Sequence, residues 1–159
     1  MLALSLAQPI AAETVAEARP AVLAAASLDV TDQRLLAQVR ELALHAQLAA
    51  PIAIDGICRL VEPGPRGEAA AYGAALLRSL AQVAVRPLVF HPRGAVEVGF
   101  DEAWLVRLVR CMAEDDEDSA RLLIGSRVTR IGRRVVTFLA KGFADRIARP
   151  LEVETLEPF

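Results

Sequence analysis

The chain has 159 residues, the size of one domain, and a domain this long can bury a core without disulfide or metal support. Its formal net charge of −2 excludes a general attraction to nucleic acid or to an anionic membrane, so either partner would need a local basic patch. Charged residues interrupt every long apolar run, whereas a membrane-spanning helix needs roughly 18 apolar residues in a row. We therefore expect a soluble protein that does not enter a membrane.

The first residues, 1–28, are rich in alanine and are interrupted by Pro9 and Pro20. They resemble a secretion signal in their small apolar residues but lack Lys or Arg ahead of the apolar run. The only cysteines, Cys58 and Cys111, are too far apart for a CxxC motif and fit a reducing compartment. We expect a cytoplasmic protein with two free thiols, whose first 28 residues are loosely ordered.

Three helices are predicted in the first half of the chain. The first covers about residues 32–50, with Asp29 or Thr31 as its N-cap. A second segment follows Pro51 and carries apolar residues at helical spacing as far as Val61. The third covers about residues 68–85 and stops before Pro87, and its apolar face predicts a central core helix.

The pattern changes at residues 88–99, where a short apolar run leads into His-Pro-Arg-Gly and then into alternating residues. This pattern predicts a short β-hairpin or an extended loop. Asp101 then resembles an N-cap, and the apolar stripe that begins at Trp104 predicts a helix. The acidic run 114–118 predicts a turn that supplies the cap of a short helix.

A last helix is predicted over about residues 130–147, ended by Pro150 and followed by an extended tail at 151–159. The whole chain, 1–159, is therefore expected to form one mainly all-α domain, a compact bundle of five or six helices. The expected centre of its core is made of apolar residues from five helical segments: Leu35, Val39, Leu42, Ile57, Leu76, Leu80, Trp104, Leu108, Val135 and Leu139.

The last helix has a basic face that is a candidate for nucleic-acid binding. Arg130, Arg134 and Lys141 share this face, and Arg133 lies beside it. Residues 121–149 contain eight basic residues and one acidic residue, a local excess that can contact phosphates. The competing interpretation is a solvated face on a core helix, in which Lys141 pairs with Asp145.

The turn at His91 and the nearby Trp104 form a second candidate, for a small ligand. His91 lies between an apolar run and Pro92, where its ring is expected to be exposed and held in place. As a general base it would need a partner, and no neighbouring Ser or Cys supplies one. A turn or packing role is therefore the stronger interpretation of His91.

No catalytic residues, cofactor or metal are predicted. The acidic run 114–118 lacks calcium-loop spacing, the two histidines and two cysteines match no zinc pattern, and the common nucleotide and hydrolase motifs are absent. The best hypothesis is a non-enzymatic interaction or regulatory protein, with self-association as a homodimer. Nucleic-acid binding and a ligand site near His91 remain the alternatives.

Overall fold

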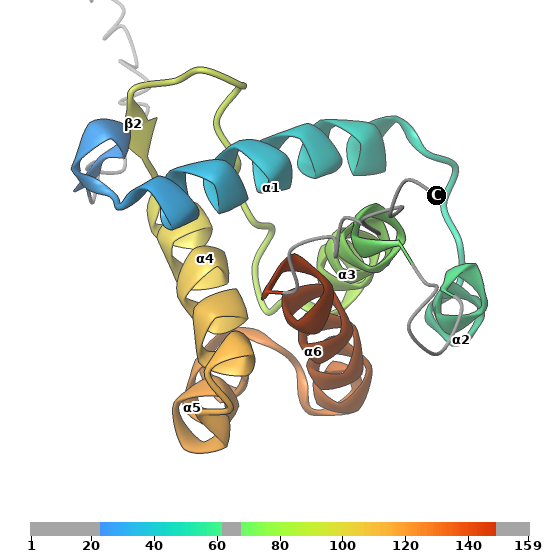
Figure 1. The fold of residues 1–159 in the computed structure, drawn as a ribbon. Coiled ribbons are helices and arrows are strands. Elements are labelled where there is room, and N and C mark those ends of the chain that lie inside the picture. The colour runs from blue at the N-terminus through green and yellow to red at the C-terminus, as the bar shows by residue number, and fades with distance from the viewer. Residues whose placement is uncertain (1–22, 62–67, 149–159) are drawn as a thin grey trace, which may run out of the picture.

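The computed structural model describes residues 23–61 and 68–148, and most of these residues are helical, which confirms the expected all-α class (Figure 1). The six α-helices are α1 (Val30–Leu48), α2 (Ile54–Ile57), α3 (Ala69–Val83), α4 (Phe100–Ala113), α5 (Glu117–Arg127) and α6 (Arg133–Ala148). Three 3-10 turns and two short strands complete the elements: η1 (Ala25–Ser27), η2 (Cys58–Leu60), η3 (Arg130–Gly132), β1 (Leu23–Ala24) and β2 (Glu97–Val98).

The helices pack around α3 and α6, which form the most extensive helix pair. α4 covers one side of α6, and α1 runs across the top of the molecule in Figure 1 and contacts both α3 and α4. The short α2 packs beside α3, and α5 folds back against α4. The third helix is therefore central, as predicted, and Tyr72, Leu76, Leu80 and Val83 on its inner face are all buried.

The helix starts follow the side chains that can cap them. Asp29 is the N-cap of α1 and accepts a 2.8 Å hydrogen bond from the Asp32 amide. Asp116 caps α5 in the same way through the Ser119 amide at 3.1 Å, which confirms that the acidic run supplies a cap. Asp101, expected as the N-cap of α4, instead lies within its first turn, and Gly99 is the N-cap.

Residues 88–99 form no hairpin in the described structure. They form an extended loop, the second of the two predicted alternatives. β2 pairs in antiparallel register with β1, so that Leu23 faces Val98. The reason is that two α4 side chains occupy loop amides that a hairpin would need: Asp101 accepts from the Val89 amide and Glu102 from the His91 amide, each at 2.8 Å. Residues 23–27, part of the segment expected to be loosely ordered, form β1 and η1.

The core matches the expected residues with one exception. Nine of the ten predicted residues are buried, but Val135 is only half-buried, and its neighbour Val136 takes the core position. In the part of the chain that the structure describes, no helix is long and apolar enough to cross a membrane. The predictions for residues 1–22 and 149–159 lie outside the described residues.

A backbone crossing fixes the start of α6 against the end of α3. The Thr129 amide donates to the Val83 carbonyl and the Val85 amide to the Arg127 carbonyl, both at 2.8 Å. Gly132 follows at this close approach, and a Cβ atom added to it would overlap the Cβ atom of Val83. Glycine is therefore required at 132 for steric reasons.

Gly132→Ala should lower the free energy of unfolding by about 1–3 kcal/mol, because the Val83 backbone must shift to admit the new methyl group. Gly125→Ala is the matched control: it lies in α5 with open space around it, and should raise stability by about 0.5–1 kcal/mol. Urea unfolding of both variants measures the difference. Equal midpoints for the two variants would contradict the close approach.

Candidate functional site

An apolar groove lies between α2 and α6. Its volume is about 440 Å³, and its walls come from α2, η2, η3 and α6. The lining residues are mainly apolar, with one acidic and one basic side chain: Ile54, Asp55, Cys58, Ile131, Arg134, Val135 and Phe138. Grooves of this size and lining are typical of binding surfaces.

α6 can line this groove because it has two apolar faces. Its inner face places Val136, Leu139 and Phe143 in the core. The outer face begins in η3 with Ile131 and continues through Val135 and Phe138, at spacings of four and three residues that keep them on one side of the helix. A helix with a single core-facing stripe would present polar residues at these positions.

The outer face exposes large apolar side chains. Ile131 is 89% exposed and Phe138 is 49% exposed. The Phe138 ring contacts Tyr72 at a centroid distance of 6.2 Å, which fixes one side of the aromatic ring against the core. Apolar side chains that gather on one exposed face mark interaction surfaces more often than isolated ones do.

Asp55 and Arg134 give the groove one charge of each sign, from opposite walls. Asp55 belongs to α2 and Arg134 to α6. Cys58 is an exposed free thiol in the same groove. The groove therefore has an apolar centre and one charge of each sign. Labelling of the Cys58 thiol can report whether the groove is open to solvent.

The predicted basic residues have separate roles in the structure. Lys141 pairs with Asp115 at 2.6 Å and with Asp145 at 2.8 Å, and its hydrogen bonds to these two carboxylates raise its pKa. Arg133 donates to the carbonyl of Gly125 in the last turn of α5 and to that of Val128 just after the helix.

Arg130 and Arg134, the other two residues of that face, are exposed. Arg134 faces the groove. Lys141 is thus neutralised locally, as the interpretation of a solvated, internally paired face expects.

Neither His91 nor Trp104 lines the groove between α2 and α6. Trp104 is buried, its indole N–H donates to the Leu123 carbonyl at 3.0 Å, and the Arg127 guanidinium lies 5.8 Å from its ring centroid. The His91 ring is half-buried against Gly99. Among the described residues no group of three or more His, Cys, Asp or Glu could hold a metal ion.

A buried ion pair between Arg40 and Glu102 was missed by the sequence analysis. Arg40 donates to the two carboxylate oxygens of Glu102 at 2.8 and 3.0 Å and to the carbonyls of Ala95 and Glu97 at 2.8 and 2.6 Å. Glu102 also accepts from the amide and ring Nδ1 of His91, at 2.8 and 3.0 Å, and from the Gly99 amide at 3.0 Å. Glu102 is therefore the partner that His91 lacked in sequence.

This cluster orients His91, which lines neither the groove between α2 and α6 nor the small pocket beside Asp101. Burial of Glu102 would by itself raise its pKa, but the hydrogen bonds from Arg40, Gly99 and His91 together hold the pKa below its ordinary value of 4.5. An ionised carboxylate with this many donors is a structural anchor for the loop and two helices.

Comparison with known proteins gives no guide to these sites: no protein-family model matches the chain, and no curated protein or solved structure matches it. Function has to be argued from geometry.

Arg40→Met should destabilise the fold by about 3–5 kcal/mol, because it leaves the Glu102 carboxylate buried without its cation. A double-mutant cycle with Glu102→Gln should show strong coupling, since each single variant already removes the ion pair. Urea unfolding of the two single variants and the double variant measures this coupling. Additive losses would show that the two side chains act independently.

The stability that Glu102 contributes should depend on pH. Because its folded pKa lies below 4.5, its contribution is complete above pH 4.5 and is lost as the pH falls through the folded pKa. The difference in unfolding free energy between the wild type and Glu102→Gln should therefore shrink in acid. A difference that stays constant from neutral pH down to the acid transition would contradict this assignment.

Proposed function

We propose that this chain is a non-enzymatic protein-interaction module whose groove between α2 and α6 binds a second copy of the same chain. The observation that carries the proposal is the outer apolar face of α6, where Ile131 and Phe138 are exposed beside the groove. Removing such side chains from water favours association, at roughly 25 cal/mol for each Å² buried.

Charge placement supports a second copy as the occupant. A two-fold interface joins the same patch on both subunits, so the patch must complement itself. Asp55 and Arg134 lie on opposite walls of the groove, so a two-fold arrangement brings Asp55 of each copy toward Arg134 of the other. The pair then forms twice across the interface, so that each charge meets one opposite charge and neither sign is in surplus.

Shape supports the same arrangement. Ile131, in η3 just before α6, is exposed at the edge of the groove that it helps to line, and the groove is large enough to receive an aliphatic side chain. In a two-fold pair, each copy inserts its Ile131 into the groove of the other, while Phe138 supplies an aromatic wall. Central apolar and aromatic anchors of this kind carry most of the energy of protein interfaces.

Ile131→Asp should weaken the dimer at least 30-fold, about 2 kcal/mol, because it places a charge at a central anchor. The matched control is Leu122→Asp, which changes an apolar residue on α5 that is 77% exposed and does not line the groove. Light scattering across a concentration series measures both, with the wild type as reference. A wild-type monomer throughout, or a dimer unaffected by Ile131→Asp, would overturn the proposal.

Cys58 gives an independent readout of the same interface. Its thiol lines the groove, whereas Cys111 is buried, so alkylation of the native protein should occur at Cys58. The labelling rate should fall as the concentration rises through the dimer transition. A rate independent of concentration would place any dimer contact elsewhere.

Absorbance at 260 and 280 nm on the same samples distinguishes the nucleic-acid alternative. A monomer that carries nucleic acid removable by salt would make Arg130, Arg133 and Arg134 the functional surface instead.

A further inference from the structure

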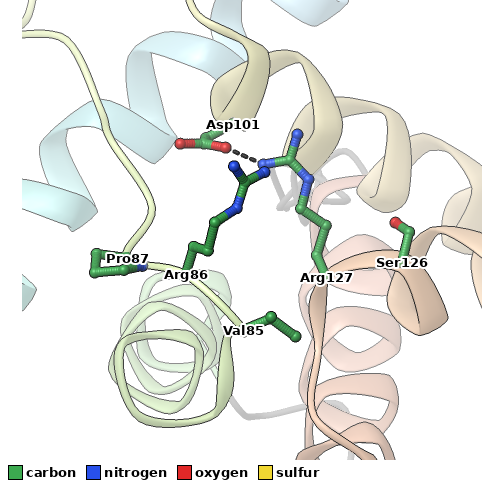
Figure 2. Close-up of a pocket in the computed structure, with 6 residues that line it drawn as sticks. All are labelled: Val85, Arg86, Pro87, Asp101, Ser126 and Arg127. Atoms are coloured by element: carbon green, nitrogen blue, oxygen red, sulfur yellow. Dashed lines mark hydrogen bonds and ion pairs between the residues drawn. The ribbon is translucent and has the colours of Figure 1, made fainter.

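A small polar pocket lies on a different part of the molecule from the groove. Its volume is about 40 Å³, and it is lined by residues from the loop after α3, the first turn of α4 and the end of α5: Val85, Arg86, Pro87, Asp101, Ser126 and Arg127. In Figure 2 the side chains of Arg86 and Arg127, which both line the pocket, extend toward Asp101, and a dashed line joins Arg127 to Asp101. We infer that this pocket binds a phosphate group.

The backbone sets the two arginines beside each other. Residues 84 and 128 form an isolated antiparallel bridge, and the Val85 amide donates to the Arg127 carbonyl at 2.8 Å. Arg86 therefore directly follows the residue whose backbone pairs with Arg127, which brings both arginines to the same pocket.

Arg127 is also held in place by its side-chain contacts. It forms an ion pair with Asp101, and its guanidinium lies 5.8 Å from the Trp104 ring centroid. Asp101 itself is fixed by the Val89 amide, which donates to it at 2.8 Å. A guanidinium has five N–H donors, so the ion pair with Asp101 leaves donors of Arg127 for a ligand in the pocket that this residue lines.

Charge favours an anion in this pocket. Its lining carries two guanidinium groups and one carboxylate, a net charge of one positive unit. Arg127 is one partner of Asp101, whereas no ion pair of Arg86 is found in the part of the chain that the structure describes. An anion between the two guanidinium groups relieves their mutual repulsion and accepts paired N–H bonds, the geometry in which arginine recognises phosphate.

Size restricts what enters. A cavity needs roughly 10–15 Å³ of this kind of space to hold one water molecule, so the pocket accepts a few heavy atoms and no ring system. The ligand is therefore inorganic phosphate, or a small molecule that inserts a terminal phosphate and leaves the rest outside. Ser126 forms part of the wall, but its hydroxyl donates to the Leu123 carbonyl, so the guanidinium groups supply the specificity.

Calorimetric titration with inorganic phosphate, against chloride at equal ionic strength, tests the site. Phosphate should bind, and Arg86→Gln should weaken that binding at least tenfold, while Arg86→Lys should retain part of it through charge alone. The matched control is Arg121→Gln, which removes an exposed arginine outside the pocket and should leave binding unchanged. Arg86 is exposed, so its replacement should not disturb folding.

A parallel titration with glycerol 3-phosphate distinguishes the two sources of the phosphate group. Tighter binding than inorganic phosphate assigns the site to a terminal phosphate, and tighter binding of inorganic phosphate assigns it to the free ion. Equal heats with phosphate and chloride, or phosphate affinity that Arg86→Gln does not change, would overturn the proposal. Neither result depends on whether the chain dimerises through the groove.

Discussion

The ion pair of Arg40 with Glu102 is the interaction on which the rest of the structure depends. Glu102 joins the distant helix α1, through Arg40, to the loop at the His91 amide and to the start of α4 at the Gly99 amide. Arg40 adds the carbonyls of Ala95 and Glu97. The loop after α3 thereby follows a defined path without a sheet of its own, because these side chains satisfy its backbone groups.

The path of that loop has consequences beyond the ion pair. It directs Glu97 and Val98 toward β1, and it sets Val89 where its amide meets Asp101. Asp101 in turn holds Arg127, the last residue of α5. Asp101 and Glu102, adjacent at the start of α4, therefore bind different parts of the chain. Glu102 binds the long helix α1, and Asp101 binds the segment that leads into α6.

Local patterns predicted the helices well, but not the contacts between distant residues. Asp29 and Asp116 cap helices as expected because an N-cap needs only its own next turn. The burial of Arg40 could have been suspected, since it lies between Leu36 and Ala43 on one helical face. Its partner, Glu102, is 62 residues away, a distance that no helical period encodes. The sequence did not predict the groove for a similar reason. Val135 and Val136 are equally apolar, and only the packing of α6 against α3 determines which of the two faces the core.

The roles of individual basic residues decide what kind of partner the surface suits. A basic stretch counted from sequence suggests an extended track for a polyanion, but Lys141 is held by carboxylates and Arg133 by carbonyl groups. Arg110 likewise joins α4 to the start of α1 through Asp32 at 2.8 Å. Arg134 lines the groove, whereas Arg86 and Arg127 line the polar pocket on a separate surface. Each of these two sites also contains one carboxylate, Asp55 or Asp101, so neither forms the continuous basic track that a chain of phosphates would need.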